Sequence, residues 1–280
     1  MQNRHTGRGV ARRLYFQASI QRFFARDARA AELCHEALRH ADYSKAHNML
    51  ADIELPGEDY FQILGRIHQH LNPATYVEIG IDQGRSFEIV KPGTLTLGVD
   101  PNPRLQKPAG PKQRVFAQTS DDFFSKTDVR AELEGRSVDL AFIDGMHQFE
   151  FALRDFINLE KLCSRNSIIL IHDVYPVDAM SAARDRVSQF WSGDIWRLIL
   201  ILKKYRPDLA VNTIAAQPTG LGIVQNLDPD SVLLEQHSQQ IIEEYLALDL
   251  AVLGDRKKEM LGLFPNDWTS IARLIDARGV

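Results

Sequence analysis

Short apolar runs alternate along the chain with segments whose apolar residues recur every three or four positions. Residues 60–71 show the second pattern, with four apolar side chains on one side of a predicted helix. Continuous apolar runs bounded by turn residues are typical of strands buried on both faces of a parallel sheet. The runs that we interpret as strands are residues 76–79, 95–99, 115–118, 138–143 and 168–173. This alternation predicts an α/β fold with a doubly wound, Rossmann-like sheet.

The pattern changes after residue 176. Residues 177–191 predict one helix, and a second helix is expected to begin at residues 192–197. Two later apolar runs, residues 210–216 and 222–225, lie on either side of a Pro-Thr-Gly turn. Such spacing indicates an antiparallel hairpin, which we expect to complete the sheet. The aromatic Trp196 is interpreted as a core residue.

Helical segments are predicted at both ends of the chain. Residues 1–72 are expected to form a helical cap that contributes to the substrate pocket or to oligomerisation, with a homodimer as one arrangement. Residues 73–227 would form the main domain, and residues 228–280 a helical extension. We also expect the N-terminal helices and the helix around Trp196 to frame a substrate pocket.

The composition of the chain limits the classes of function to be considered. The chain has 280 residues, a 44% hydrophobic composition and a formal net charge of −4, which argues against general nucleic-acid binding. No apolar run approaches the length of a transmembrane helix. The two cysteines, Cys34 and Cys163, are far apart and predict packing roles in a reducing compartment, and we therefore expect a cytoplasmic protein.

The first thirty residues are strongly basic. Seven arginines precede or surround the first acid, Asp27. A targeting peptide and a helix that meets an anionic membrane surface both have this composition. However, Leu14, Phe16 and Ile20 recur at near-helical spacing, which favours an amphipathic helix packed on the rest of the protein.

The first predicted strand is followed by a loop with glycines at its two turns, which is suited to binding a small cofactor. Gly80 permits a sharp turn, and Gly84 opens the following segment. A dinucleotide fingerprint would need glycines where Asp82 and Arg85 stand, so a nicotinamide cofactor is disfavoured. Glu78, at the strand end, would suit a cationic amino group. The next strand ends in a second acid, Asp100, which we expect to accept hydrogen bonds from a ribose.

Polar side chains also follow the fourth and fifth predicted strands. Asp144 comes directly after residues 138–143, and His172 and Asp173 end the next strand. The carboxyl ends of parallel strands share one edge of the sheet, where ligands bind. His147 lies close by in the sequence, and we expect these four side chains to converge.

At these residues the chain resembles the class I S-adenosylmethionine-dependent methyltransferases, in particular their small-molecule and glycan O-methyltransferase branch. The resemblance spans roughly residues 74–226. In that family the first two strand ends hold the cofactor, and the start of the helix after the third strand contacts adenine. The resemblance therefore implies S-adenosylmethionine as the cofactor. The residues implied in its binding are Glu78, Gly80, Ile81, Gly84, Ser86, Asp100, Ser120 and Asp121.

The implied reaction is methyl transfer to a hydroxyl of a small molecule or sugar. His147 is the candidate general base, because an unperturbed imidazole titrates near neutrality, and Asp144 would assist it. Asp144, His172 and Asp173 form the candidate site for a divalent cation, magnesium or manganese. Related catechol-type enzymes have an acid where His172 stands, and an imidazole shifts the preference away from magnesium.

Two alternatives remain open. Two histidines and a carboxylate are also the ligand set of non-heme iron oxygenases, and the chain resembles cephalosporin-hydroxylase-like proteins as well. A dependence on oxygen, ferrous iron and a 2-oxo acid would distinguish this hydroxylase from a methyltransferase. The fold would also suit a binding module without catalysis, since a fold does not determine its function.

Overall fold

The computed structural model describes residues 2–277, and side chains from residue 6 onward. The described strands form one sheet in the order β3-β2-β1-β4-β5-β7-β6-β8. Strands β1 to β5 run parallel, and β7 is antiparallel to both β5 and β6. The strands are β1 (Thr75–Ile79), β2 (Leu95–Val99), β3 (Gln113–Phe116), β4 (Val138–Ile143), β5 (Cys163–His172), β6 (Ala210–Ile214), β7 (Leu221–Gln225) and β8 (Leu263–Phe264). The expected doubly wound sheet with a late antiparallel hairpin is confirmed.

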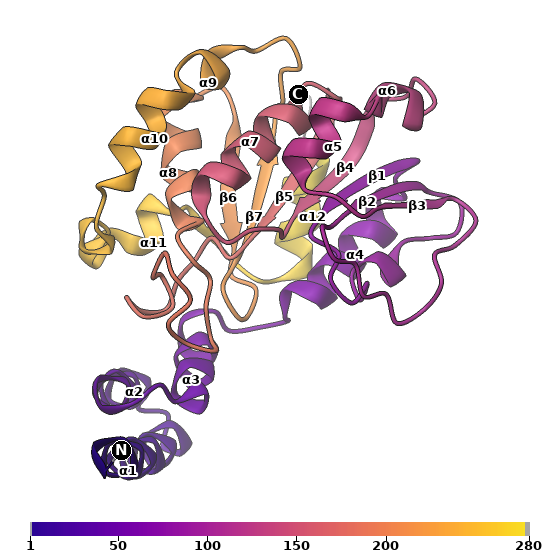
Figure 1. The fold of residues 1–280 in the computed structure, drawn as a ribbon. Coiled ribbons are helices and arrows are strands. Elements are labelled where there is room, and N and C mark those ends of the chain that lie inside the picture. Colours follow the sequence, from indigo (N-terminus) through magenta and orange to yellow (C-terminus); the bar gives the residue numbers. More distant parts are fainter. Residues whose placement is uncertain (1, 278–280) are drawn as a thin grey trace.

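Helices cover both faces of this sheet (Figure 1). The helices are α1 (Gln2–Phe23), α2 (Asp27–His40), α3 (Ser44–Glu54), α4 (Tyr60–Leu71), α5 (Ser120–Lys126), α6 (Val129–Glu132), α7 (Phe149–Glu160), α8 (Trp196–Tyr205), α9 (Leu233–Gln236), α10 (Ser238–Leu246), α11 (Lys257–Met260) and α12 (Trp268–Asp276). Helices α5, α7, α8 and α10 share one hydrophobic core with the sheet. Helices α4 and α12 share the core on the opposite face.

Local sequence explains the sharp limits of α4, which begins and ends where the apolar pattern predicts. Asp59 accepts a hydrogen bond from the Gln62 backbone N–H, and the Gln62 side chain accepts one from the Asp59 N–H. This capping box satisfies two of the donors that a helix start leaves free. Asn72 ends the helix in a left-handed conformation, with φ of 44°.

The prediction of a helix at residues 177–191 is wrong. This segment consists of turns and bends between β5 and α8. Asp178 and Ser181 hydrogen-bond each other's backbone N–H groups, and the Trp191 indole donates to the Ala183 carbonyl at 2.5 Å. Arg184 also forms ion pairs with acids of neighbouring segments. Such side-chain contacts compete with the hydrogen bonds of a helical backbone, and in this segment they stabilise an irregular conformation instead of a helix.

Smaller differences concern short elements. The segment after the first loop forms only a single 3₁₀ turn at Phe87–Ile89, because Pro92 and Gly93 follow closely. Strand β3 begins two residues earlier than the predicted run. Strand β8 was not predicted, since two residues carry no periodic signal, but it pairs with β6 and so joins the C-terminal extension to the sheet.

Helices α1 to α3 pack together beside the sheet domain (Figure 1) and bury a hydrophobic cluster of their own. This helical unit contacts the irregular segment of residues 177–191. His47 of α3 lies 3.2 Å from an Asp178 oxygen and stacks on the Phe190 ring, with the ring centroids 5.0 Å apart. Asp42 accepts a hydrogen bond from the Gln189 backbone N–H at 3.2 Å. Among residues 2–277, no helix combines the length and apolar character needed to cross a membrane.

Candidate active site

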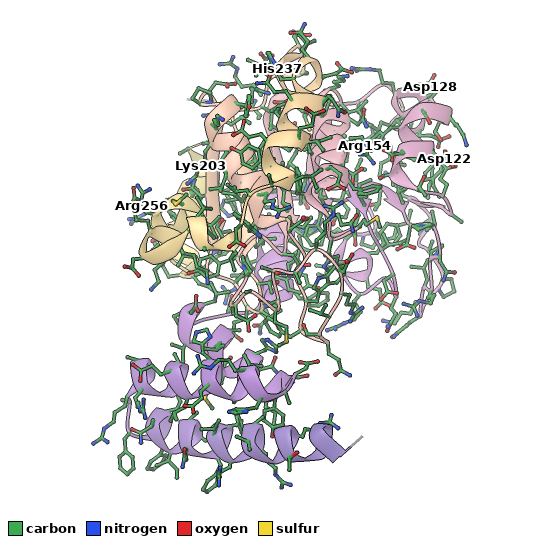
Figure 2. All side chains as sticks on the ribbon, turned by 60° about the vertical axis from the view of Figure 1, so that its left-hand side comes forward. Asp122, Asp128, Arg154, Lys203, His237 and Arg256 are labelled. Carbon is green, nitrogen blue, oxygen red and sulfur yellow. The ribbon has the colours of Figure 1, made fainter. Side chains whose placement is uncertain are left out.

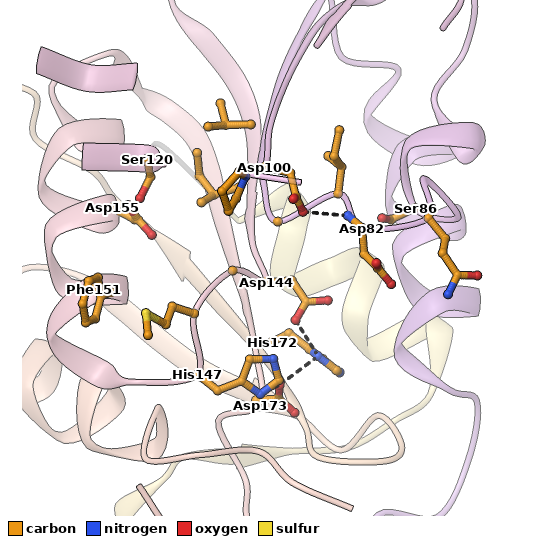
Figure 3. A pocket seen from close by; sticks show the side chains of 18 of the residues that line it. Asp82, Ser86, Asp100, Ser120, Asp144, His147, Phe151, Asp155, His172 and Asp173 are labelled. Carbon is orange, nitrogen blue, oxygen red and sulfur yellow. Dashed lines mark hydrogen bonds and ion pairs between the residues drawn. The ribbon is translucent and has the colours of Figure 1, made fainter. Parts of the chain in front are cut away.

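A cavity of about 930 Å³ opens at the carboxyl ends of the parallel strands. Residues that follow β1, β2, β4 and β5 line it, together with the start of α5 and part of the irregular segment (Figure 3). This is the edge at which open α/β sheets bind ligands. Its volume suits a cofactor together with part of a second molecule.

Gly80 allows the loop after β1 to lie directly against the end of β4. Its φ is +88°, and a Cβ atom built there would lie 2.1 Å from the Asp144 carbonyl oxygen. Backbone hydrogen bonds of 2.8 Å join Gly80 to Val99 and Asp144 to Ile79. A side chain at Gly80 would therefore separate the strand ends that form the cavity.

The expected ribose ligand, Asp100, lines the cavity at the end of β2. One carboxylate oxygen accepts the Asp82 backbone N–H at 2.9 Å (Figure 3), and the other accepts the Asn102 N–H at 2.7 Å. Ile81 also lines this part, and Arg104 forms an ion pair with the Asp82 side chain. Asp100 therefore also holds the β1 loop in place, in addition to facing the cavity.

Glu78 lies behind the cavity wall. It is fully buried, the Tyr76 hydroxyl donates to it at 3.0 Å, and Ser86 donates to its other carboxylate oxygen. Burial raises the pKa of Glu78 to about 8, despite these two hydrogen bonds. Ser86 itself lines the cavity, whereas Glu78 and Gly84 are not part of the lining. The structure thus connects Glu78 to the cavity through Ser86.

Ser120 and Asp121 line the far end of the cavity, at the start of α5. The Thr119 side chain caps this helix by accepting the Asp122 N–H at 3.2 Å. Two hydrogen bonds from Arg154, of 2.9 and 2.8 Å, lower the pKa of Asp121.

Asp155 of α7 also lines this end, and sequence reasoning missed it. Its side chain is buried, which raises its pKa to about 7, and Oδ1 lacks a hydrogen-bond partner among the described residues. An acid among the mostly apolar buried positions of α7 was the available signal. Such a carboxyl could donate or accept a hydrogen bond at the base of a bound nucleoside.

The four polar side chains expected at the ends of β4 and β5 do converge (Figure 3). The Nδ1 atom of His172 lies 3.1 Å from Asp144 Oδ1 and 3.4 Å from Asp173 Oδ2. The Nδ1 atom of His147 lies 3.0 Å from the same oxygen of Asp173. All four residues line the cavity, so two carboxylates and two imidazoles share one region.

Neighbouring residues restrict both imidazoles. The His147 ring stacks on Trp191 with centroids 4.8 Å apart and an angle of 7° between the planes. The Tyr60 ring lies over His172, with centroids 3.9 Å apart. Thr219 donates a hydrogen bond of 2.5 Å to Asp173, which orients its carboxylate. The cluster is therefore preorganised.

Charges within the cluster stabilise one another. Burial lowers the pKa of His172, but Asp173 and Asp144 outweigh burial and raise it to about 10. Burial and the same two acids act on His147 in the same way, and its pKa is also raised. For Asp173, burial raises the pKa, yet the two histidines lower it well below its usual range. The carboxylates therefore favour a positive charge between them.

The residues whose ligand atoms lie close enough together to hold a metal ion differ from the set that the sequence predicted. Ligand atoms of Asp144, His147 and Asp173 lie within 4.8 Å of one another. The Nδ1 atom of His172 faces both acids, while its Nε2 is buried and lacks a hydrogen-bond partner among the described residues. The geometry thus places His147, as well as His172, beside the two candidate carboxylate ligands.

The remaining wall of the cavity comes from the irregular segment, through Arg186, Gln189, Phe190 and Trp191. Of the cap expected over residues 1–72, Tyr60 at the start of α4 lines the cavity, whereas Trp196 does not line it. No residue of 6–59 belongs to the lining, and Trp196 is buried in the core, as a core aromatic should be. The helical unit reaches the cavity indirectly, through the stacking of α3 on this wall.

Known proteins share sequence features with the part of the chain that forms this sheet and its loops. Residues 77–174 match a family model described as a methyltransferase domain. This segment runs from the middle of β1 to just past the end of β5 and includes the strand-end residues of the cavity. Over these residues the chain is therefore similar to a methyltransferase domain, which agrees with the resemblance that its motifs indicated. A search of curated proteins gives no match.

Several solved structures are similar at low identity. Cofactor-bound Rv0187 from MTB is 16% identical, with a TM-score of 0.47, over 65% of this chain and 88% of its own. The O-methyltransferase TomG from Streptomyces achromogenes, involved in tomaymycin synthesis and in complex with SAM, is 13% identical, with a TM-score of 0.48, over 60% and 79%. An O-methyltransferase from Bacillus cereus in complex with SAH is 15% identical, with a TM-score of 0.43, over 62% and 86%. Because these TM-scores are below 0.5, the likenesses assign neither an activity nor a substrate to this chain.

Proposed function

We propose that the chain is an S-adenosylmethionine-dependent methyltransferase that methylates a hydroxyl of a small molecule or sugar. The observation that supports this most is the position of the His147 and Asp144 cluster in the same cavity as the Asp100 loop. A methyl donor held by the first two strand ends would then face a proton acceptor. We further propose a cytoplasmic protein, in which Cys34 and Cys163 stay reduced and buried.

In this proposal the cofactor lies across the ends of β1 and β2. Asp100 accepts hydrogen bonds from the ribose hydroxyls, and the start of α5 with Asp155 lies at the base. Ser86 meets the amino-acid end, with Glu78 behind it as a positioning residue. Gly80 and Ile81 bring the loop backbone close enough to contact the cofactor.

The acceptor would occupy the other half of the cavity, against Trp191 and the two histidines. The reaction needs alignment and proton removal. S-adenosylmethionine would supply the methyl group and leave as S-adenosylhomocysteine, and His147 would accept the proton that the hydroxyl loses. Asp173, 3.0 Å from His147 Nδ1, stabilises the positive charge that the imidazole gains.

The residues present also fit a divalent cation, with a mixed set of ligands. Asp144, Asp173 and His147 or His172 would hold it, and a bound cation would lower the pKa of the acceptor hydroxyl. Nitrogen ligands favour manganese, iron or zinc over magnesium. A cation that recruits His147 would remove that residue from the role of base, so the two roles are distinguishable.

The decisive experiment is transfer of radiolabelled methyl from S-adenosylmethionine to a panel of hydroxylated small molecules and sugars. Calorimetry with S-adenosylhomocysteine should accompany it. Binding together with turnover supports the proposal, whereas binding without turnover on a broad panel would favour a binding module. No binding of either cofactor form would refute it.

A second candidate is a non-heme iron hydroxylase, favoured by the close approach of two histidines and two carboxylates. It requires oxygen, ferrous iron and a 2-oxo acid as co-substrate. Consumption of oxygen that depends on both iron and the 2-oxo acid would identify this activity.

A further inference from the structure

Helix α1 presents an unusual outward surface. It is the outermost helix of the molecule, on the far side of α2 from the sheet domain (Figure 2). Its buried side, with Ala11, Leu14 and Ala18, faces the core of the helical unit. The side opposite these residues carries exposed side chains.

That outward side is apolar over its C-terminal half. Phe16 is 66% exposed, Ile20 42%, Phe23 84% and the following Phe24 61%. The spacing of the first three places them on one side of the helix. The Phe23 and Phe24 rings also touch, with centroids 5.3 Å apart. Several large apolar side chains exposed on one side of a helix favour a contact with something outside the chain.

The same surface is basic over its N-terminal half. Arg12 and Arg13 are exposed on the side of Phe16, one turn before it, and Arg8 is exposed one turn earlier. None of the three has a hydrogen bond or ion pair with another described residue. Residues 6–29 contain six arginines against a single acid, Asp27, in a chain whose net charge is −4. The patch is therefore amphipathic and strongly cationic.

We propose that α1 docks on an anionic lipid surface. We define the docking face as Arg12, Arg13, Phe16, Ile20 and Phe23, with Phe24 beside it. The aromatic and aliphatic side chains would enter the interface between head groups and acyl chains, while the arginines meet the lipid phosphates. Pairing with a second copy fits less well, because it would bring two strongly cationic surfaces together.

This docking and the catalytic activity are separable. Helix α1 contributes no described residue to the cavity, and it contacts the sheet domain through α2 and α3. Binding to lipid should therefore survive changes in the active site. Loss of docking should leave turnover of a freely diffusing acceptor unchanged.

The test is co-sedimentation of the full chain with vesicles of phosphatidylglycerol and phosphatidylcholine, compared with phosphatidylcholine alone. We expect at least about tenfold more protein on the anionic vesicles at low salt, and less at high salt. Phe16→Ser combined with Phe23→Ser should abolish this binding, and Arg12→Gln with Arg13→Gln should weaken it. Circular dichroism should verify that each variant keeps its helices.

Matched controls use residues of the same type elsewhere on the surface. Val232→Ser with Val252→Ser removes apolar side chains of 48% and 45% exposure, and Arg165→Gln with Arg273→Gln removes two exposed charges. Both controls should bind like the unaltered chain. Equal binding to neutral and anionic vesicles, or full binding by the Phe16/Phe23 variant, would overturn the proposal. A dimer in light scattering that this variant dissolves, without vesicle binding, would assign the face to a second copy instead.

Discussion

The Nδ1 atom of His147 lies 3.0 Å from Oδ2 of Asp173, although β5 and a whole helix separate the two in sequence. The contact exists because β4 and β5 are parallel neighbours, whose carboxyl ends meet at one edge. An imidazole held in this way has its second ring nitrogen available for a proton from a bound molecule.

Replacement of the proposed base tests this arrangement. His147→Gln should lower kcat by roughly 10²- to 10⁴-fold, the usual contribution of a positioned general base. Affinity for S-adenosylhomocysteine should change little, because His147 lies on the acceptor side. His237→Gln, at an exposed histidine, is the control and should keep full activity. Equal kcat values for the two variants would exclude His147 as the base.

Metal dependence is tested by chelation. If a cation assists, chelator treatment should reduce turnover, and added manganese should restore more of it than magnesium because of the imidazole neighbours. Asp173→Asn should then bind manganese more weakly, which calorimetry measures directly. Full activity after chelation, together with an active Asp173→Asn variant, would leave the cluster as a metal-free acid–base site.

Cofactor affinity should depend on Asp100. Asp100→Ala removes a carboxylate that faces the cavity and holds the Asp82 backbone at 2.9 Å. A hydrogen bond to a charged group contributes about 1.5–3 kcal/mol, so S-adenosylhomocysteine binding should weaken by about tenfold to a hundredfold. Asp255→Ala, at an exposed surface acid, is the comparison. Indistinguishable dissociation constants would remove Asp100 from the cofactor site.

Glu78 should make stability depend on pH. Burial raises its pKa from 4.5 to about 8, so between these values the folded state retains a proton that the unfolded state releases. The free energy of unfolding should therefore fall as pH rises through this interval, by up to about 1.4 kcal/mol per pH unit from this group. In Glu78→Gln this contribution disappears. Parallel urea titrations at pH 5 and 8 should show a smaller loss in the variant, and identical losses would contradict the assignment.

Gly193 should be required for the position of His147. It has a φ of +63°, and a Cβ atom built there would lie 1.8 Å from the His147 carbonyl oxygen. Gly193→Ala should displace that backbone, lowering kcat and destabilising the fold by about 1–3 kcal/mol. Gly93→Ala, where no atom lies within 4 Å of the added Cβ, should be tolerated. A fully active Gly193→Ala variant would show that the backbone can adjust.

The predictable parts of the structure are those encoded by neighbouring residues. The apolar run of residues 138–143 predicted the limits of β4, and the apolar stripe of residues 60–71 predicted those of α4. The convergence of the strand-end acids could be predicted because parallel strands end at the same edge of the sheet. Residues 177–191 have helical spacing, but contacts such as the stacking of Phe190 on His47 hold them in an irregular path. Asp155 was missed although it is an acid at a mostly apolar set of helical positions, since a single acid on a helix acquires a role only when its surroundings are known.

The two halves of the cavity have different freedom to change. The half of the cavity at which the cofactor is proposed to bind is formed by the ends of β1 and β2. Both strands are hydrogen-bonded to their neighbours, so insertions there would break the hydrogen bonds between strands. The opposite wall is an irregular segment, which can vary in length and sequence without such a cost. Yet its Phe190 and Gln189 contact the helical unit, through His47 of α3 and through Asp42 between α2 and α3. New acceptor preferences could therefore arise by exchange of this segment, provided that the helical unit changes with it.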